Sequence, residues 1–372
     1  MSKRVLITGG AGFIGSHLSD LLLASGFSVR VLDNLTPQVH GSDCRRPHYL
    51  DADTELMIGD VRDRQAVERA LRNVDAVVHL AAFVGVGQSM YDIASYVQVN
   101  ELGTAVLLEV LSKQPVERLI VASSMSIYGE GLARGRNGDL LSPAERPIEQ
   151  LRAGRWELCD PDGQVVTPVA TPETKQPSFS SVYALNKYVQ ERMALIVGKA
   201  YGIPTVALRF FNVYGPRQAL SNPYTGVLAI FASRLLNGRP PLIFEDGRQL
   251  RDFVHVRDVA QACLLALQSN SAVDSVFNIG SGRSRTILSI ASDLAHVTGV
   301  SQLTPCVVGK YRAGDIRHCF ADITRSRTQL GYAPQVAFDD GLAELADWLS
   351  DQVADDHVER ATTELEIRGL VA

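Results

Sequence analysis

Two side chains that could exchange a proton with a substrate lie four residues apart, in Tyr183-Ala184-Leu185-Asn186-Lys187. Positions i and i+4 face the same side of a helix, so the Tyr183 phenol and the Lys187 ammonium would share one site. A neighbouring positive charge favours the ionised phenol. We therefore expect Lys187 to lower the pKa of Tyr183, so that the phenol acts as a base near neutral pH. The same spacing also arises by chance in exposed helices, so the function of the pair depends on the motifs around it.

A glycine-rich turn near the N-terminus makes catalysis the better interpretation of this pair. The sequence Thr8-Gly9-Gly10-Ala11-Gly12-Phe13-Ile14-Gly15 follows a strand-like run and opens a helix-like one. Its glycines therefore satisfy the G-x-G-x-x-G fingerprint in the required context. Glycines at these positions let backbone N–H groups and a helix N-terminus approach a pyrophosphate. The turn predicts a bound dinucleotide.

An acidic residue indicates which dinucleotide to expect. Asp33 lies 18 residues after Gly15, at the end of the second strand-like run, where a carboxylate accepts hydrogen bonds from an adenosine ribose. An arginine directly after that run would indicate a 2′-phosphate, but Asn34 and Leu35 stand there. We therefore predict NAD rather than NADP. Its positive nicotinamide ring would act together with Lys187 on the phenol.

Hydroxyl side chains end a third strand-like run. Ser123 and Ser124 directly follow Leu119–Ala122. In a parallel sheet this position is the carboxyl edge, where ligands bind. Ser124 could therefore hydrogen-bond a reacting carbinol or carbonyl oxygen. The alternative is a turn in which the hydroxyl only closes the strand.

The elements that must position these residues follow from an alternation of short apolar runs and amphipathic stretches. The alternation predicts βαβ units, a doubly wound parallel sheet with helices on both faces, and hence an α/β Rossmann fold. The runs are Val5–Thr8, Ile14–Ala24, Val29–Asp33, Ala66–Leu71, Ala76–Ala81, Ala105–Leu111 and Arg118–Ser123. Further on, Val182–Tyr201 predicts a long helix and Thr205–Phe211 a strand. The shorter elements after them are expected to form a smaller mixed α/β lobe.

Composition excludes several classes of protein. The chain has 372 residues, of which 46% are hydrophobic and 21% charged, as is typical of globular proteins. A net charge of −5 gives no overall basic field, so nucleic acid is not an expected partner. The apolar run 21–24 is too short to span a membrane, and the first residues lack the features of a secretory leader, so we expect a cytoplasmic protein without a membrane partner. Five scattered cysteines argue against a disulfide framework.

A long stretch between the Ser124 and Tyr183 motifs breaks the alternation. Residues 130–177 are rich in Gly, Pro, Arg and Asp, and we interpret them as an insertion beside the active site in which only Pro147–Trp156 could form a short helix. Cys159 and Asp162 resemble half of a zinc knuckle. One thiol does not complete a structural zinc site, so we expect no metal.

Ordered motifs along most of the chain resemble the extended short-chain dehydrogenase/reductase family, the group of NAD-dependent nucleotide-sugar epimerases and dehydratases. Besides the features above, these motifs are Asp60-Val61-Arg62-Asp63, Leu80-Ala81-Ala82, Asn100, Arg209-Phe210-Phe211-Asn212-Val213-Tyr214-Gly215-Pro216-Arg217 and Arg251-Asp252-Phe253-Val254-His255-Val256. They occur in the family's order from Val5 to about Leu349. Such a series is specific for the family and less specific for the substrate.

The resemblance implies one NAD on the parallel sheet. The catalytic residues would be Ser124, Tyr183 and Lys187. The residues expected to contact NAD are Gly9, Gly12, Phe13, Ile14, Gly15, Asp33, Asn34, Asp60, Val61, Leu80, Ala81, Ala82, Asn100, Ser123, Tyr183, Lys187, Phe210 and Val213.

The resemblance also implies a nucleoside-diphosphate sugar held by the C-terminal lobe. Its expected contacts are Val86, Ser124, Ser126, Asn212, Arg217, Leu242, Phe244, Arg251, Asn278, Arg312 and Asp315. Arg217, Arg251 and Arg312 would supply the positive charges that two phosphates need. Phe244 would stack on the base, and Asn278 would line the nucleoside pocket.

The same resemblance suggests how the chain is divided. Residues 1–212 would form the Rossmann domain, interrupted by the insertion at 130–177, and residues 213–350 would mainly form the substrate lobe, with 252–280 returning to the Rossmann domain. Residues 351–372 would be a C-terminal tail, either solvated or a loosely docked helix. The helices near 97–111 and 182–201 resemble those that pair in the dimers of this family, so a homodimer is expected.

Residues after the catalytic serine discriminate between reactions of the family. The 4,6-dehydratases carry an Asp-Glu pair there, because removing water requires an acid and a base, but this chain has Met125 and Ser126. A 4-epimerase needs neither: Tyr183 takes the C4 hydroxyl proton, the C4 hydride passes to NAD, the keto sugar rotates, and the hydride returns to the other face. The segments 84–91, 124–131 and 219–230 look most like bacterial proteins of the dTDP-L-rhamnose 4-epimerase type.

We therefore predict an isomerase, an NAD-dependent nucleotide-sugar 4-epimerase acting on a dTDP-6-deoxyhexose. The alternatives are a 4-epimerase of the UDP-glucose/galactose type or a nucleotide-sugar 4-ketoreductase. A 4,6-dehydratase or a decarboxylase is disfavoured. A protein that binds NAD without catalysis is a further class, which the presence of Ser124, Tyr183 and Lys187 does not favour.

Overall fold

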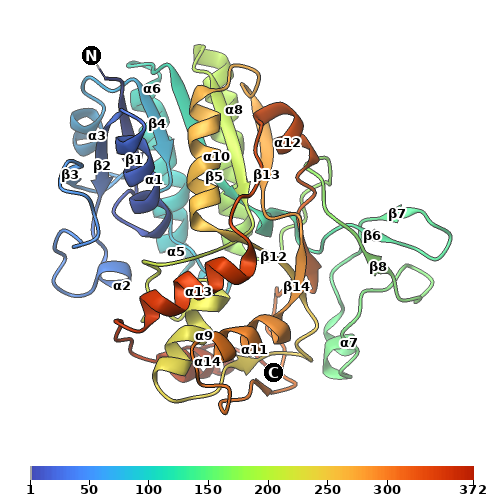
Figure 1. The fold of residues 1–372 in the computed structure, drawn as a ribbon. Helices are drawn as coiled ribbons and strands as arrows, with labels where there is room; N and C mark the ends of the chain where they lie inside the picture. Colours follow the sequence, from blue (N-terminus) through green and yellow to red (C-terminus); the bar gives the residue numbers. More distant parts are fainter. Residues whose placement is uncertain (1) are drawn as a thin grey trace.

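A seven-stranded parallel sheet forms the centre of the computed structural model, which describes residues 2–372 (Figure 1). Along the sheet its strands are β13 (Ser275–Ile279), β9 (Thr205–Phe210), β5 (Arg118–Ser124), β4 (Ala76–His79), β1 (Arg4–Thr8), β2 (Ser28–Asp33) and β3 (Glu55–Ile58). The order reverses between β1 and β4, which creates the crevice in which Rossmann folds bind ligands. The predicted Rossmann fold is confirmed.

Helices cover both faces of this sheet, which explains why its strands are apolar throughout. On one face lie α1 (Phe13–Ala24), α10 (Val256–Gln268) and α12 (Thr324–Leu330). On the other lie α3 (Arg64–Ala70), α6 (Gly103–Leu111) and α8 (Val182–Tyr201). Every residue of β9 is buried between these layers. The carboxyl ends of the strands form the open edge of this three-layer arrangement of helices, sheet and helices.

Short helical segments follow the first strands at this edge. They are α2 (Pro37–His40), α4 (Val86–Ser89), α5 (Ile93–Tyr96), the π-helical segment η1 (Val97–Leu102) that continues into α6, and the 3-10 turn η2 (Met125–Tyr128).

A second lobe lies beyond the carboxyl edge of the sheet, in the lower part of Figure 1. Its core is formed largely by α9 (Val227–Leu236), α11 (Ile287–Val297) and α13 (Phe338–Leu349). Its short strands are β10 (Asn212–Tyr214), β12 (Leu250–His255), β14 (Ser284–Thr286) and β16 (His318–Cys319) in one sheet and β11 (Leu242–Ile243) and β15 (Cys306–Val307) in another. Between β12 and β14 the chain returns to the central sheet to form β13.

The stretch between η2 and α8 projects from the side of the molecule (Figure 1). It contains an antiparallel sheet of β6 (Ala133–Arg134), β7 (Leu140–Leu141) and β8 (Thr167–Pro168), and the short helix α7 (Ile148–Arg152). Ala133, Leu158 and Val166 form a small core of its own. The helix α7 lies within Pro147–Trp156, the range in which the sequence predicted that a short helix could form.

The last residues form the helix α14 (Val358–Ile367) and a C-terminal strand-like segment. The sequence left open a solvated tail or a loosely docked helix, and the structure has a firmly docked helix. Ala361 and Leu365, one turn apart, are buried, and so is Val371. The few apolar residues of this segment are therefore concentrated on one face, which the sequence pattern did not reveal.

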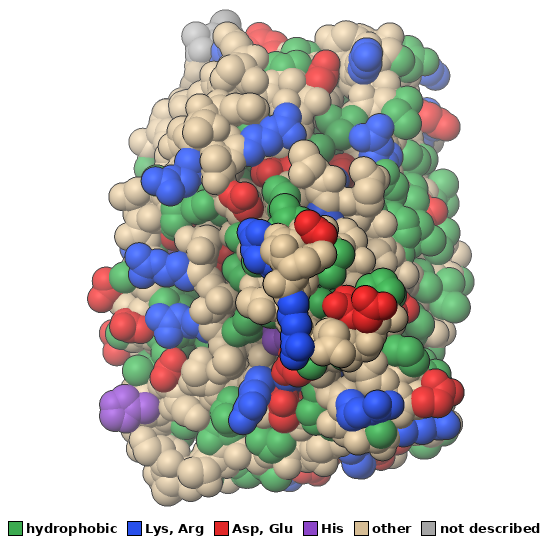
Figure 2. All heavy atoms as spheres, turned by 90° about the vertical axis from the view of Figure 1, so that its right-hand side faces the viewer, with side chains coloured by type: hydrophobic (Ala, Val, Ile, Leu, Met, Phe, Trp, Pro, Cys, Tyr) green, Lys and Arg blue, Asp and Glu red, His purple; other side chains and the backbone are tan. Residues whose placement is uncertain are grey.

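The molecular surface carries mixed charges. Figure 2 shows basic and acidic side chains interspersed over the face from which the insertion projects. Among residues 2–372, no helix is long and apolar enough to cross a membrane.

Candidate active site

A cavity of about 330 Å³ opens where the strand order reverses, and we call it the glycine-turn cavity. Gly9 adopts a φ of +69°, and a Cβ there would approach the Ala81 backbone to 2.8 Å. A Cβ on Gly15 would lie 2.4 Å from the Gly10 Cα. The turn between β1 and α1 therefore requires glycine at these positions for packing as well as for ligand access.

The N-terminus of α1 faces this cavity without a side-chain cap. Gly12 is the N-cap residue, and no side chain accepts from the first turn. Phe13, Ile14 and Gly15, which carry N–H groups of that turn, line the cavity. Free N–H groups at a helix N-terminus bind phosphate. The site therefore fits the pyrophosphate of a dinucleotide.

Asp33 ends β2 at the wall of the same cavity. Its carboxylate accepts hydrogen bonds from the N–H groups of Ala11 at 3.0 Å and Leu35 at 2.9 Å, so it is held in place by the glycine-rich turn. Asp60 lies beside it along the cavity and pairs with Arg62, whose side-chain hydrogen bond lowers the pKa of Asp60. None of the described residues lining the cavity is an arginine, so the bidentate partner that would favour a 2′-phosphate is missing from its wall.

The glycine-turn cavity brings together every residue that the sequence assigned to NAD except Asn100. Asn100 is fully buried, and both ends of its amide bind the backbone of Phe83, with Oδ1 accepting at 2.7 Å and Nδ2 donating at 3.0 Å. Phe83 itself lines the cavity. Asn100 therefore supports the wall of the cavity from behind, and its expected contact with NAD stays a prediction.

Ser124 and Tyr183 line both this cavity and a second one. Ser124 is the last residue of β5, and Tyr183 lies in the first turn of α8, where Ser181 caps the helix by accepting from the Ala184 N–H at 3.2 Å. Burial raises the pKa of Tyr183, and a hydrogen bond with Ser124 opposes this effect. Ser126 Oγ donates to Ser124 Oγ at 2.9 Å. A hydroxyl group and a phenol thus meet at the junction of two cavities.

Lys187 is placed in the glycine-turn cavity as expected, but its contact differs from the expected one. Its Nζ donates to Gln190 Oε1 at 2.9 Å. Burial lowers the pKa of Lys187 to about 7, while the charge of Glu191 opposes this. The pKa of Tyr183 is raised rather than lowered, because desolvation of the phenol outweighs its hydrogen bond with Ser124.

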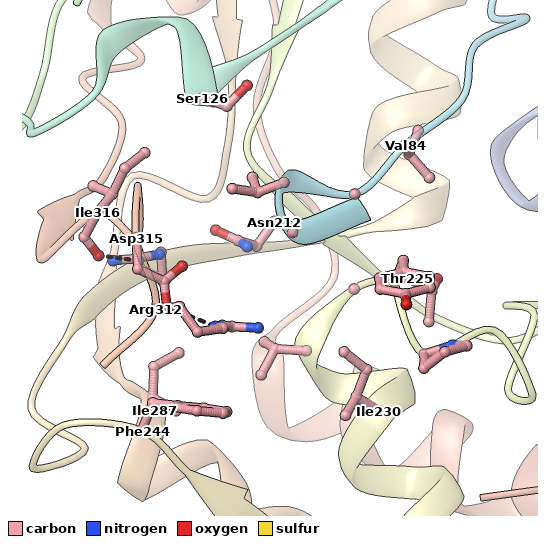
Figure 3. Close-up of a pocket in the computed structure, with 18 of the residues that line it drawn as sticks. Val84, Ser126, Asn212, Thr225, Ile230, Phe244, Ile287, Arg312, Asp315 and Ile316 are labelled. Carbon is pink, nitrogen blue, oxygen red and sulfur yellow. Dashed lines mark hydrogen bonds and ion pairs between the residues drawn. The ribbon is translucent and has the colours of Figure 1, made fainter. Parts of the chain in front are cut away.

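The second cavity, of about 360 Å³, lies between the carboxyl edge of the sheet and the second lobe, and we call it the interlobe cavity (Figure 3). The Arg312 guanidinium lies 4.7 Å from the centre of the Phe244 ring, and its Nε donates to Asp315 at 3.0 Å. Arg251, which is half-buried and also lines the cavity, donates to the backbone carbonyls of Leu250 and of residues 316 and 317. Among the described lining residues these two arginines and Asp315 are the charged ones.

Unpartnered polar atoms mark this cavity as a ligand site. Asn212 Oδ1 and Gln249 Oε1 are buried and have no hydrogen-bond partner among the described residues, and both residues line the cavity. A buried polar atom without a partner is costly unless a ligand or water satisfies it. Asn212 Oδ1 is an acceptor, so it would take a hydroxyl or N–H donor of the ligand, whereas the expected contact with a sugar diphosphate would use Asn212 Nδ2. Gln249 was not singled out from the sequence, since nothing in its local pattern distinguishes it.

Of the residues assigned to the substrate, all but two line the interlobe cavity. Arg217 lies elsewhere, paired with Asp20 at 2.7 Å and stacked on the Tyr49 ring. Asn278 is fully buried and binds Tyr128 and the backbone of Thr171. Other protein groups bind both side chains in the structure, and their contacts with the substrate stay predictions.

Several lining residues escaped the sequence analysis because they come from segments without a motif. They include Tyr224 and Thr225, which precede α9, and Val358, Ala361, Thr362, Leu365 and Leu370 from the C-terminal segment. For the C-terminal segment, the signal available in the sequence was the four-residue spacing of Ala361 and Leu365, which places both on one face of a helix.

The insertion is joined to the interlobe cavity by a buried ion cluster. Arg317, whose side chain is fully buried, pairs with Glu245 at 2.9 Å, Asp246 at 2.6 Å and Glu157 at 2.5 Å. Arg146 of the insertion pairs with Glu245 at 2.8 Å and donates to the Asp315 carbonyl at 3.1 Å. Glu245 directly follows Phe244, so the cluster holds both sides of the slot between Phe244 and Arg312.

The zinc-knuckle-like sequence forms an ordinary turn. Cys159 pairs with Val165 in a β-bridge, and Asp160 accepts from the N–H groups of Asp162 and Gln164. Within residues 2–372 no group of three or more His, Cys, Asp or Glu side chains is arranged to hold a metal ion.

Comparison with known proteins places this geometry in a family. The NAD dependent epimerase/dehydratase family matches residues 5–150 and 161–280, with the gap inside the insertion. The chain belongs to this family. The predicted family and its NAD cofactor are confirmed, and the glycine-turn cavity is where the residues fit that cofactor.

Individual relatives are similar over nearly the whole chain. A dTDP-L-rhamnose 4-epimerase from Burkholderia thailandensis is 36% identical, covering 94% of this chain and 96% of the relative. Among solved structures, the UDP-glucose 4-epimerase of Thermus thermophilus in complex with NAD is 33% identical with a TM-score of 0.73, covering 94% and 100% of the two chains. The UDP-glucuronic acid 4-epimerase of Bacillus cereus with UDP-glucuronic acid and NAD is 29% identical with a TM-score of 0.77, covering 93% and 99%.

Proposed function

We propose that this protein is an NAD-dependent nucleotide-sugar 4-epimerase whose substrate is a dTDP-6-deoxyhexose such as dTDP-L-rhamnose. The observation that carries the proposal is that Ser124 and Tyr183 line both cavities. A sugar in the interlobe cavity and a cofactor in the glycine-turn cavity would therefore meet at these two side chains. The sugar nucleotide follows from the similarity to the Burkholderia thailandensis enzyme.

The chain's own residues supply what the reaction needs besides hydride transfer. The residues of the glycine-turn cavity would hold NAD, which would supply the acceptor and the donor for the C4 hydride. Tyr183 Oη removes the proton of the C4 hydroxyl and returns it at the end of the cycle. Ser124 orients the C4 oxygen through its hydroxyl. A protonated Lys187, next to the phenol in the first turns of α8, favours the phenolate.

The diphosphate is proposed to bind at the arginine side of the interlobe cavity. Arg312 lies over the Phe244 ring and presents N–H donors to the cavity, and Arg251 lies beside it. Arginine binds phosphate oxygens in a bidentate manner. Asn212 would donate to the same group from the other side. The sugar would then extend from there toward Ser124 and Tyr183.

Dehydration is not proposed, because the turn after Ser124 lacks an acid and a base. Met125 and Ser126 stand there, and Ser126 Oγ is engaged with Ser124 Oγ at 2.9 Å. No ionisable side chain follows Ser124 directly, whereas eliminating water requires proton transfer at two carbons.

Product analysis tests the proposal against its alternatives. The purified protein, incubated with dTDP-L-rhamnose and separately with UDP-glucose without added reductant, is analysed by chromatography and mass spectrometry. A C4 epimer of unchanged mass from the dTDP sugar supports the proposal. An epimer from the UDP sugar alone would indicate the UDP-glucose type, and a product formed only with stoichiometric NADPH consumption would indicate a ketoreductase.

We further propose a division of labour along the chain, with residues 1–212 binding NAD and residues 213–350 binding most of the sugar nucleotide. A cytoplasmic homodimer fits the remaining observations. All five cysteines are free. Leu102, Leu185 and Ile196 are exposed on η1 and α8, which pack together. Exposed apolar side chains on adjacent helices favour association, and sedimentation velocity would test it.

A further inference from the structure

The C-terminal helix α14 forms one wall of the interlobe cavity. Ala361 and Leu365 lie on its inner face, and both are buried and line the cavity. Leu365 packs directly against α4, because a Cβ added to Gly87 would lie 3.2 Å from Leu365 Cδ1. The contact between α14 and α4 thus closes the cavity with aliphatic surface.

Both ends of this segment are anchored, so the wall has a defined position. Before the helix, Arg234 of α9 pairs with Asp356 at 3.3 Å, and both side chains are buried. After it, the Ala313 N–H donates to the Leu370 carbonyl at 2.8 Å, and the Tyr311 N–H donates to the Ala372 carbonyl at 2.9 Å. The final residues therefore pair with the segment that carries Arg312.

The residue that follows α14 also contacts the segment that follows α4. The Arg368 guanidinium lies 4.5 Å from the centre of the Tyr91 ring. The Tyr91 hydroxyl is 2.5 Å from the Tyr224 hydroxyl, and Tyr224 lines the interlobe cavity. Leu365 thus lies in a packed contact between three segments of the chain.

This wall lies close to the proposed reaction centre. Ser89, two residues after Gly87, accepts a hydrogen bond from the Tyr183 N–H at 3.1 Å. The four-residue α4 therefore separates Leu365 on one side from Tyr183 on the other. A sugar with its C4 at Tyr183 would direct a substituent of a neighbouring carbon toward α4 and Leu365.

The charge distribution in the cavity restricts what that substituent can be. The charged lining residues among those described, Arg251, Arg312 and Asp315, lie around Phe244. The surface formed by Gly87, Met90 and Leu365 offers no charge and no side-chain hydrogen-bond donor. A carboxylate there would lose its hydration without a partner, and an unpaired hydroxyl would carry a smaller cost.

We infer that Leu365 is a specificity-determining residue that contacts the C6 group of the sugar and selects a methyl over a hydroxymethyl or carboxylate group. This inference rests on the proposed function and adds the residue that discriminates between substituents at C6 of the sugar. A pocket of this kind discriminates against an added hydroxyl by about tenfold to a hundredfold.

The test compares two substrates that differ only at C6, dTDP-L-rhamnose and dTDP-L-mannose. For the native protein, kcat/KM for C4 epimerisation is expected to be about tenfold to a hundredfold higher for dTDP-L-rhamnose. Leu365→Ser should reduce this ratio about tenfold, mainly by raising KM for dTDP-L-rhamnose, because it removes apolar contact and supplies a hydroxyl. Binding of dTDP alone should change less than about twofold, because the nucleotide lies on the arginine side.

Two further variants separate specificity from folding. Leu365→Met keeps an apolar side chain of similar volume and should retain the native ratio. Ile367→Ser lies on the same helix but is 75% exposed and outside the cavity, so both kinetic constants should stay native. If Leu365→Ser does not fold, which the dTDP titration detects, the native ratio and the Leu365→Met ratio still decide the question.

The inference would be overturned by a native enzyme that epimerises both substrates equally or prefers dTDP-L-mannose. A Leu365→Ser variant that binds dTDP normally and keeps the native ratio would overturn it as well. Failure of the proposed function has a different signature, since no nucleotide sugar would then yield a C4 epimer with any variant.

Discussion

The backbone N–H of Tyr183 donates a hydrogen bond to the Ser89 hydroxyl oxygen, with a distance of 3.1 Å. Ser89 in turn donates to the carbonyl of Val86 at 2.7 Å, so the first turn of α8 is joined to the whole of α4. Val86 lines the interlobe cavity, and Tyr183 lines both cavities. The proposed catalytic phenol and the adjacent sugar-facing wall are therefore positioned as one unit.

Replacing Tyr183 by Phe should abolish epimerisation while leaving NAD bound. The ring still fills its space, but the phenol that moves the C4 proton is removed, and loss of such a group lowers kcat by about 10²- to 10⁴-fold. Product formation measures kcat, and the NAD released on denaturation measures retention. Tyr188→Phe removes a hydroxyl from the same helix outside both cavities and should remain active. Native turnover by the Tyr183 variant would contradict the proposed role.

Lys187 should make the stability of the protein depend on pH in a defined direction. Burial lowers its pKa to about 7 in the folded chain, whereas an unfolded chain has a lysine pKa of about 10.4. Between these values the unfolded state binds the extra proton, so the free energy of unfolding rises with pH, by at most about 1.4 kcal/mol per unit, and the gain is lost as pH falls through about 7.

Replacing Lys187 by Met removes this titration. Urea unfolding of the native and variant proteins between about pH 7 and 9 should therefore show a rising difference between their unfolding free energies. Lys199→Met, on the exposed end of the same helix, serves as the control and should follow the native protein. A pH-independent difference for Lys187→Met would show that Lys187 titrates at its ordinary pKa when folded.

Asp33 should determine the preference for NAD over NADP. Asp33→Asn keeps the size of the side chain but removes the charge that binds ribose hydroxyls and repels a 2′-phosphate. Hydrogen bonds to charged groups contribute about 1.5–3 kcal/mol, so NAD affinity should fall roughly 10- to 100-fold while NADP affinity does not fall. Calorimetric titration of both dinucleotides measures the ratio. Asp53→Asn, which is exposed and outside the cavity, should leave it unchanged, and an unaltered ratio in Asp33→Asn would refute the assignment.

The buried cluster around Arg317 should link the insertion to substrate affinity. Arg317→Met leaves Asp246 without an ion-pair partner, while Glu245 keeps Arg146 and Glu157 keeps His318. The loss of unfolding free energy should therefore lie below the roughly 3–5 kcal/mol that breaking an isolated buried ion pair costs. Because Glu245 adjoins Phe244, KM for the sugar nucleotide should rise with little change in kcat. Arg155→Met, exposed in the same insertion, should stay within about 0.5 kcal/mol of native. Urea unfolding measures the loss of stability, and steady-state kinetics measure KM and kcat. An unchanged KM would show that the insertion does not contribute to substrate binding.

The central sheet and the position of the main motifs were predictable because they depend on local spacing. The glycines directly follow β1, and Asp33 and Ser124 are the last residues of β2 and β5. Parallel strands have their carboxyl ends at one edge, so residues that end different strands must gather there. Tyr183 and Lys187 join them because α8 begins beside this edge.

The site residues carried over from the resemblance stay predictions, and three of them do not line the cavity expected for them. Asn100, Arg217 and Asn278 carry the expected residue types, yet each binds other protein groups instead of lining its cavity. For Lys187, the sequence identified Tyr183 as the neighbour on the helix. It did not show that burial would be the main influence on the pKa values. Burial determines both its pKa and that of Tyr183, and the degree of burial follows from packing rather than spacing.

The sequence alone determined the fold class and the cofactor and predicted the reacting side chains, since each is encoded within a few residues of one strand or helix. Only the tertiary structure decided that Leu365, 182 residues after Tyr183, closes the cavity beside α4 and that Arg317 unites the insertion with the second lobe. Both contacts join segments with no shared local pattern. Their free energy comes from burial of apolar surface and pairing of charges, which exist only once the lobes have packed together.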